Sequence, residues 1–225
     1  MNTVKSDESA ETKALKDFLL DINCLDPLYE WTNKFNLFDI LKITRTEIRH
    51  SNMLSWLLDP NETHGLGDNV LKGFVQHTSQ SLFKENDLFE ILLMDFYNFT
   101  IQREWHNIDI VAVSNEKHFV LCIENKIDSN EHDNQLERYR KIIMDTYPEY
   151  TQIFLYLSPQ GIDASDSENW VSISYNDVLE IIENTKKKVK LLPEVALLID
   201  NYTDIIRRHI VEDKKLIEIC TNIYV

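Results

Sequence analysis

Two apolar stretches that meet charged residues decide the fold of this chain: Ile108-Asp109-Ile110-Val111-Ala112-Val113, and Phe119-Val120-Leu121-Cys122-Ile123 followed by Glu124-Asn125-Lys126. Each is a short run of β-branched and aromatic residues, and a polar turn separates the two, which predicts neighbouring antiparallel strands. A carboxylate in such a run is costly unless it lies at a strand end, is paired or binds a metal ion. Asp109 and Glu124 are therefore the first candidates for functional residues.

The relative position of these charges depends on the register of the two strands. Side chains alternate between the faces of a sheet, so Glu124 and Lys126 share one face. A loop of even length between the strands would place Asp109 opposite Glu124 and bring the three charges to one end of the sheet. A loop of odd length would send them to opposite faces, because a slip of one residue turns every side chain over. The sequence leaves both registers open.

Converging carboxylates of this kind predict a metal site that hydrolyses phosphodiesters. Two nearby carboxylates disfavour each other's ionisation unless a cation joins them, and Mg²⁺ binds one or two carboxylates together with water and phosphate. In this interpretation Asp109 and Glu124 bind Mg²⁺ or Mn²⁺, and protonated Lys126 positions the water or neutralises charge in the transition state. The alternative is a salt bridge among the same residues that only solvates the end of the sheet. The Glu-x-Lys pattern alone is unspecific, since residues 11–13 and 212–214 match it too.

The remaining periodicity predicts one α/β domain over residues 1–225. Residues 1–12 are expected to form a loose tail, residues 13–90 a helical front and residues 176–222 C-terminal helices. The core lies in residues 96–175, with strands expected at 96–104, 108–113, 119–126, 152–157 and 170–175 and a helix at 131–145. This order is α-β-β-β-α-β.

Composition narrows the function classes. The four glycines do not form the loops that cradle nucleotide phosphates, which excludes a P-loop or dinucleotide site. The net charge of −15 should repel polyanions, so we expect the isolated chain to bind DNA weakly and in a salt-sensitive way, or with a partner. The three scattered cysteines fit a reducing compartment, and no signal peptide or membrane-spanning segment is recognisable. We therefore expect a cytoplasmic protein that does not contact membranes.

Taken together, these residues resemble the PD-(D/E)xK nuclease superfamily. The likeness rests on Asp109 and on Glu124-Asn125-Lys126 within the α-β-β-β-α-β order, although Ile108 stands where the superfamily's name has proline. Gln135-Leu136-Glu137-Arg138-Tyr139 is similar to the Q-x-x-x-Y element of its RecB-like exonuclease branch. Glu47 to Pro60 and His64 to Asp68 are similar to the front helix and loop of an uncharacterised bacterial family in the same superfamily. The resemblance covers roughly residues 35–180.

The resemblance implies a restriction-endonuclease-like fold, in which helices flank a central mixed sheet, and a set of site residues. Asp109, Glu124 and Glu47 would bind the metal, Lys126 would serve the water, and Gln135 would join the catalytic group. Tyr139 would line the site and touch the DNA strand. Two of these assignments have plain structural alternatives: Glu47 as a solvated helix residue, and Tyr139 as a core residue packed with Leu136 and Ile143. Further substrate contacts are predicted at Arg103, Arg138 and His50.

The function implied is metal-dependent hydrolysis of DNA, in phage defence or DNA processing. The alternative is an interaction or regulatory module that keeps the nuclease fold without activity, which the acidic composition favours. A basic rim is expected from Arg103, Arg138, Arg140, Lys141 and the lysines between 186 and 190, with a solvated helix face as the other interpretation of those lysines. RNA or branched DNA as substrate, endonuclease or exonuclease mode, and a protein partner or homodimer stay open.

Overall fold

The computed structural model of the chain describes residues 4–129, 131, 134–212 and 214–223. Contacts between Cα atoms divide it into two compact units, one formed by residues 37–211 and one by residues 1–36 with 212–225. A compact unit is not by itself an independently folding domain. The single-domain organisation of residues 1–225 therefore stays a prediction.

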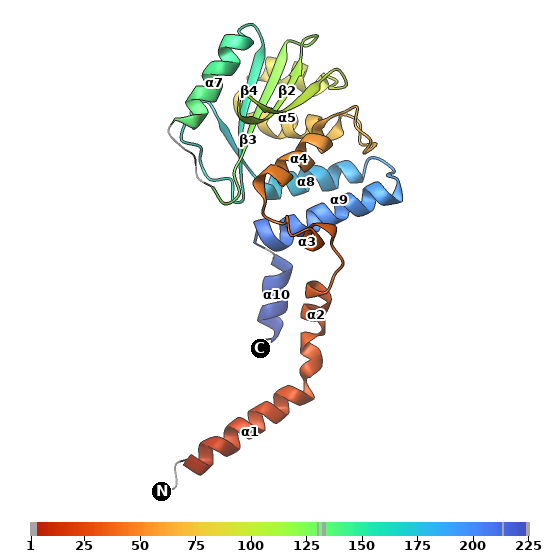
Figure 1. Cartoon of the computed structure of the whole chain (residues 1–225), viewed down its shortest axis with the longest axis vertical. Helices are drawn as coiled ribbons and strands as arrows, with labels where there is room; N and C mark the ends of the chain where they lie inside the picture. Colours follow the sequence, from red (N-terminus) through yellow and green to blue (C-terminus); the bar gives the residue numbers. More distant parts are fainter. Residues whose placement is uncertain (1–3, 130, 132–133, 213, 224–225) are drawn as a thin grey trace. The chain divides into compact units, whose positions relative to one another are not determined.

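The larger unit is built on one mixed five-stranded sheet (Figure 1). Its strands are β1 (Thr100–Trp105), β2 (Ile108–Ser114), β3 (Phe119–Asn125), β4 (Thr151–Ser158) and β5 (Val171–Ser174), adjacent in that order. The pairs β1–β2 and β2–β3 are antiparallel, whereas β3–β4 and β4–β5 are parallel. All five predicted strands are present. The first begins at Thr100 instead of residue 96, because Phe96 and Phe99 pack in the core outside the ladder.

Helices cover both faces of the sheet, as Figure 1 shows. The larger hydrophobic cluster joins one face to α4 (Glu47–Leu58), α5 (Asn69–Leu82), α8 (Tyr175–Lys186) and α9 (Pro193–Ile205). The smaller cluster joins the other face to α7 (Gln135–Thr146). The unit also contains α3 (Leu37–Ile40), α6 (Glu85–Leu93) and a π-helical turn, η2 (Ile206–Ile210). The fold is the predicted restriction-endonuclease-like α/β fold.

Burial on both faces explains the unbroken apolar runs of the central strands. Ile110, Leu121 and Ile123 belong to the larger cluster, while Val111 and Cys122 belong to the smaller one. Alternate side chains of one strand thus enter different cores, so a central strand covered on both faces needs apolar residues at almost every position. The charges of Asp109 and Glu124 stand out for this reason.

Local signals set several helix boundaries. Helix α4 ends before Asp59-Pro60. Helix α9 begins at Pro193, a position where the backbone N–H has no partner within the helix, so the missing N–H of proline costs no hydrogen bond. Helix α8 begins with a capping box in which Ser174 and Asp177 exchange side-chain and backbone hydrogen bonds. The helix expected at 131–145 begins only at Gln135, after Asn134 in a left-handed conformation. Residues 132 and 133 of that prediction lie outside the described residues.

The smaller unit consists of α1 (Val4–Leu20), η1 (Ile22–Leu25), α2 (Asp26–Thr32) and α10 (Lys214–Ile223). The loose tail expected at 1–12 is helical from Val4 onward, and residues 1–3 lie outside the described part. Ala, Glu and Lys favour helices even where there is little to bury, so low hydrophobicity was the wrong criterion there. Leu15, Phe18 and Leu19 recur at helical spacing on α1 and are exposed. Among the described residues, no helix combines the length and the apolar character needed to cross a membrane.

Candidate active site

The hairpin register brings the two predicted carboxylates together. Ser114 pairs with Phe119 and Ile110 pairs with Ile123, so residues 115–118 form a loop of even length. The same antiparallel register places Asp109 opposite Glu124, one step beyond the Ile110–Ile123 pair. Residues opposite each other in antiparallel strands share a face. Both carboxylates therefore lie at the same end of the sheet, on the face that α7 covers.

Glu124 is the most deeply buried of the charged residues at this end of the sheet. Its side chain is 1% exposed, and Oε1 accepts hydrogen bonds from Lys126 Nζ at 2.7 Å and from Gln135 Nε2 at 2.8 Å. Oε2 is buried and has no hydrogen-bond partner among the described residues. Burial, and then the charge of Asp109, raise the pKa of Glu124 to about 7 despite the opposing effect of Lys126.

Lys126 links the carboxylate on the sheet to a second one on a helix. Besides its contact with Glu124, its Nζ lies 3.6 Å from Oε1 of Glu47. Burial by itself would lower the pKa of Lys126, but the negative charges of Glu124, Glu47 and Asp109 outweigh it and raise that pKa. The ammonium group therefore stays charged at neutral pH, which suits a role in positioning and excludes a general base.

Asp109 is held by the backbone of the neighbouring strand. Its Oδ2 accepts a hydrogen bond of 2.9 Å from the N–H of Asn125. Burial raises the pKa of Asp109, and this hydrogen bond and the charge of Lys126 oppose the rise. Arg103 supports the same residue from β1: its guanidinium donates to the carbonyl oxygen of Asp109, and its Nε donates to Asn52 Oδ1 on α4 at 3.1 Å. Arg103 thus braces the end of β2 against α4.

Glu47, the first residue of α4, reaches the site as predicted but not as part of a carboxylate cluster. Its Oε2 accepts hydrogen bonds from Ile127 N at 3.0 Å and from Ser129 Oγ at 2.9 Å, and its Oε1 faces Lys126. Glu47 therefore fixes the segment that follows β3 and holds Lys126 in place.

Gln135 and Tyr139 lie four residues apart on α7 and form a hydrogen-bonded chain from Glu124. Gln135 Nε2 donates to Tyr139 Oη at 2.9 Å, and that hydroxyl donates to the carbonyl oxygen of Asn107 at 2.7 Å. The ring of Tyr139 is 2% exposed and packs with Leu136 in the smaller cluster. The predicted contact of Tyr139 with DNA is therefore corrected. Its ring instead belongs to the core, as in the alternative given above, because the face of α7 that carries Gln135 and Tyr139 packs against the sheet.

His50 and Arg138, two further predicted substrate contacts, differ in their exposure. His50 is 1% exposed, its Nε2 is 2.9 Å from the carbonyl oxygen of Thr44, and its ring packs against Tyr175 and Tyr202. That prediction is wrong, because His50 is one helical turn beyond Glu47 on the side of α4 that faces the core. Burial lowers the pKa of His50, so the ring is neutral at pH 7.

Arg138 is exposed, with its guanidinium 5.4 Å from the centroid of the Tyr139 ring, so it stays available to a substrate.

A model of the PD-(D/E)XK nuclease superfamily matches residues 35–225 of the chain. The chain belongs to this superfamily. No curated protein and no solved structure gave a significant match. Nucleases of this superfamily hydrolyse phosphodiesters, bind nucleic acid and generally use divalent metals. The likeness of Gln135 to Tyr139 to the Q-x-x-x-Y element, and the likeness to one bacterial family, stay predictions.

The candidate site includes a buried polar group that the sequence argument missed. Asn125, the middle residue of Glu124-Asn125-Lys126, points to the opposite face from its neighbours and is 0% exposed. Its Nδ2 donates to Ser51 Oγ at 2.9 Å, and its Oδ1 accepts from Tyr175 Oη at 2.8 Å. A buried amide requires such partners, so the need for them was predictable. Their identity was not, because α4 and α8 are distant in sequence.

The two carboxylates on the sheet suit a divalent ion. Within the described part of the chain, no group of three or more His, Cys, Asp or Glu side chains is arranged as a metal site. Asp109 and Glu124 alone match the one or two carboxylates that Mg²⁺ takes, with water and phosphate as the other ligands. The observation that fits an ion is Glu124 Oε2, a buried oxygen to which no group in the described residues donates. Glu47, the third predicted ligand, is instead engaged with Lys126, Ile127 and Ser129.

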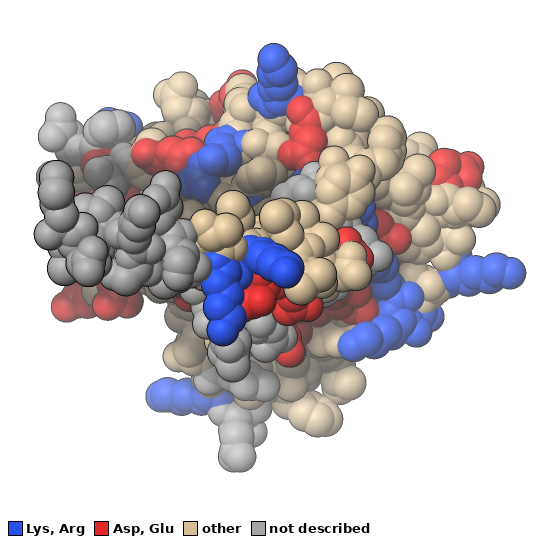
Figure 2. All heavy atoms as spheres, turned by 90° about the horizontal axis from the view of Figure 1, so that it is seen from below, with Lys and Arg blue, Asp and Glu red and all other residues tan. Residues whose placement is uncertain are grey.

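Two residues of the expected basic rim are paired with carboxylates. Arg140 Nε lies 3.1 Å from Asp166 Oδ2, and Lys186 pairs with Asp200 and Glu183. In Figure 2, basic and acidic side chains are interspersed over the described part of the face shown.

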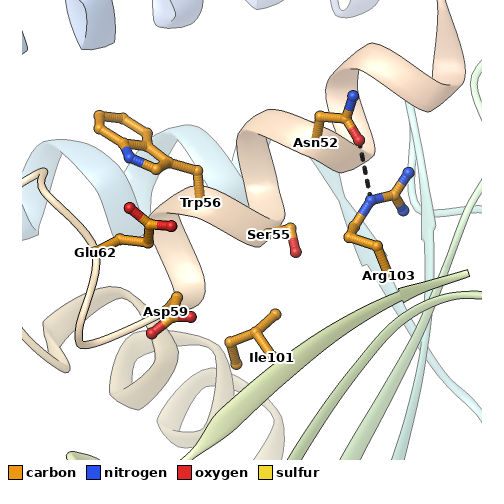
Figure 3. A pocket seen from close by; sticks show the side chains of 7 residues that line it. All are labelled: Asn52, Ser55, Trp56, Asp59, Glu62, Ile101 and Arg103. Atoms are coloured by element: carbon orange, nitrogen blue, oxygen red, sulfur yellow. Dashed lines mark hydrogen bonds between the residues drawn. The ribbon is translucent and has the colours of Figure 1, made fainter. Parts of the chain in front are cut away.

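A small pocket of about 240 Å³ lies on the outer side of Arg103 (Figure 3). Helix α4 contributes Asn52, Ser55 and Trp56, and β1 contributes Ile101 and Arg103, while Asp59 and Glu62 close the other end. Figure 3 shows the Arg103 guanidinium turned toward Asn52. Two carboxylates and an engaged arginine make this pocket a poor phosphate site.

Proposed function

We propose that this chain is a divalent-metal-dependent DNA nuclease whose reaction centre is the end of the β2–β3 hairpin. The observation that supports it best is the convergence of Asp109, Glu124 and Lys126 on one face, with Glu124 Oε2 buried and unpaired among the described residues. DNA as the substrate, and phage defence or DNA processing as the cellular role, rest on the resemblance of the sequence alone.

Each residue has a distinct task in this proposal. Asp109 and Glu124 would hold Mg²⁺ or Mn²⁺, which when bound polarises the phosphate and lowers the pKa of a water. Lys126 orients the water and offsets the negative charge that develops on the phosphate. Glu47 keeps the ammonium group at this position through its Oε1, and Gln135 fixes the rotamer of Glu124 through Oε1.

The test is cutting of linear and plasmid DNA at low ionic strength with Mg²⁺, Mn²⁺ or EDTA. We expect cutting that depends on the metal and is abolished by EDTA. Asp109→Asn and Lys126→Ala should each reduce the rate by about 100-fold or more, because each removes a group that stabilises the transition state. Exposed Asp163 and Lys84 provide matched controls, and Asp163→Asn and Lys84→Ala should cut like the unchanged chain. Absence of metal-dependent cutting, or equal cutting by the site variants, would contradict the proposal.

One contact favours the second candidate, a nuclease fold that serves only as an interaction module. Lys126 Nζ is 2.7 Å from Glu124 Oε1 and 3.6 Å from Glu47 Oε1, so the site has internal ion pairs. Calorimetric titration with Mn²⁺ separates the two candidates. A nuclease should bind Mn²⁺ and lose that binding in Glu124→Gln, whereas an inactive module should neither bind Mn²⁺ nor cut DNA.

A further inference from the structure

A second pocket, of about 320 Å³, opens directly beside Lys126. It lies where the carboxyl ends of the parallel strands β3 and β4 meet, and its walls include Lys126, Ser129, Tyr156, Pro159, Gln160 and Ile162. Open α/β sheets bind ligands beyond the carboxyl ends of parallel strands. Because Lys126 belongs both to this pocket and to the candidate reaction centre, a ligand in the pocket would adjoin the phosphodiester that reacts.

The walls of this pocket have the chemistry of a nucleotide site. Tyr156 is paired in register with Glu124 and contributes to the wall, but its ring is 2% exposed and packs in the smaller hydrophobic cluster, so it offers a base little surface. Ile162, at the rim, is a large apolar side chain that is 55% exposed. Pro159 and Ile162 therefore supply the apolar surface against which the face of a base can pack, and such packing tolerates every base because each has a π-face.

The polar walls suit the rest of a nucleotide. Lys126, which also pairs with Glu124 and Glu47, is the positive charge in the wall nearest to a phosphate. The exposed amide of Gln160, which has no partner among the described residues, can both donate to and accept from a base edge. Asp128 also lies in the wall, but it is paired with Arg45, whose Nε donates to Asp128 Oδ2 at 2.9 Å. Its negative charge is therefore partly neutralised before a ligand arrives.

Size decides between a single nucleotide and a duplex. A volume of about 320 Å³ lies at the lower limit of pockets for small molecules, roughly 300–1,000 Å³, and has no room for a stack of base pairs. A base inside a duplex has both faces stacked and its edge paired, so it can enter such a pocket only after leaving the helix. Single strands and frayed ends supply such bases at the lowest cost.

We propose that this pocket binds one unstacked nucleotide next to the scissile phosphodiester, and that the chain consequently acts on single-stranded DNA or on frayed DNA ends in preference to intact duplex. The inference rests on the proposed nuclease function, since it places the reacting phosphate at Asp109 and Glu124. Beyond that function, it specifies that the substrate is single-stranded or frayed, and it names Gln160 and Ile162 as the residues that select this form.

Binding measured in EDTA tests the pocket without any reaction. The probe is a short labelled DNA strand, followed by fluorescence anisotropy alone and as a blunt duplex. The single strand should bind about tenfold more tightly than the duplex, and Gln160→Ala or Ile162→Ser should each remove most of that difference. Leu197→Ser is the matched control, because Leu197 is 54% exposed on α9, outside the pocket. Equal binding of strand and duplex, or variants that bind like the unchanged chain, would overturn the inference.

Competition identifies which part of the nucleotide is bound. A deoxynucleoside 5′-monophosphate should displace the labelled strand at about one tenth of the concentration that inorganic phosphate requires, and this advantage should vanish in Ile162→Ser. Equal competition by the two would show that only a phosphate is held, and the inference would fail.

Cutting assays separate this inference from the proposed function. Metal-dependent cutting of single strands and duplex at equal rates, unchanged in Gln160→Ala, would refute the pocket and leave the nuclease intact. Preferential binding of single strands without cutting in Mg²⁺ or Mn²⁺ would support the pocket and refute the nuclease.

Discussion

Consecutive residues at the end of β3 have opposite tasks because successive side chains point to opposite faces of a sheet. Glu124 faces α7 and leaves one oxygen unpaired among the described residues, whereas Asn125 faces α4 and α8, where Ser51 and Tyr175 satisfy its amide. The N–H of Asn125 also holds Asp109. Asn125, for which no chemistry is predicted, therefore holds Asp109 in place and ties the end of β3 to α4 and α8.

His50 gives a prediction at the residue scale. Its pKa is lowered by burial, so the unfolded chain binds a proton at this residue more readily than the folded chain. The free energy of unfolding should therefore fall as the pH drops below about 6.5, the ordinary pKa of histidine. His50→Gln should flatten this loss, as measured by urea unfolding between neutral and mildly acidic pH. An unchanged slope in His50→Gln would contradict the assignment.

At the scale of elements, the helix layer behind the sheet depends on one close approach. Helices α5 and α8 meet at Gly73, where a Cβ would lie 2.6 Å from Ile181 Cγ2. This branch carbon sits on the Ile181 Cβ and cannot swing aside as a flexible chain end would. Since α8 also supplies Tyr175 to Asn125, the spacing of the two helices bears on the support of the site.

Gly73→Ala should therefore destabilise the fold although alanine is the better helix former. We expect a loss of about 1–3 kcal/mol from overpacking, against a gain of about 1 kcal/mol from helix propensity. In an Ile181→Ala background the steric conflict is absent, and the same substitution should become stabilising. Urea unfolding of the four proteins measures both effects. A Gly73→Ala variant that is more stable than the unchanged chain would show that the helices can move apart freely.

At the scale of the whole molecule, both large hydrophobic clusters lie within residues 37–211. This segment contains the complete sheet, the helices on both faces and every candidate site residue. Its buried residues at the C-terminal side, Ile199, Tyr202 and Ile205, come from α9. Residues 37–211 therefore have the core that an independently folding domain requires.

We expect residues 37–211 to fold when produced alone. Thermal unfolding followed by near-ultraviolet circular dichroism should show one cooperative transition, within about 5 °C of the main transition of the full chain, because a shift of this size corresponds to only about 1–2 kcal/mol. A segment of residues 37–192, which lacks α9 and its buried side chains, is the control and should not fold. Failure of residues 37–211 to unfold cooperatively would show that the other residues belong to the same folding unit.

Much of the fold followed from local pattern. The five strands and the helix between β3 and β4 appear near their predicted positions, and prolines mark the end of α4 and the start of α9. Periodicity and proline act within a few residues, so they can be recognised in a single sequence. The misjudged segments, at residues 1–12 and 96–99, are those in which polarity or aromatic content was a poor guide to backbone conformation.

By itself, the sequence determined which side chains are chemically able to form the site: Asp109, Glu124, Lys126, Glu47 and Gln135. Tertiary structure alone decided the hairpin register that joins Asp109 to Glu124, the burial of His50 and Tyr139, the bracing role of Arg103 and the partners of Asn125. The physical reason is that register, burial and hydrogen-bond partners depend on contacts between residues far apart in the chain. Only the packed helices and sheet bring those residues within reach of one another.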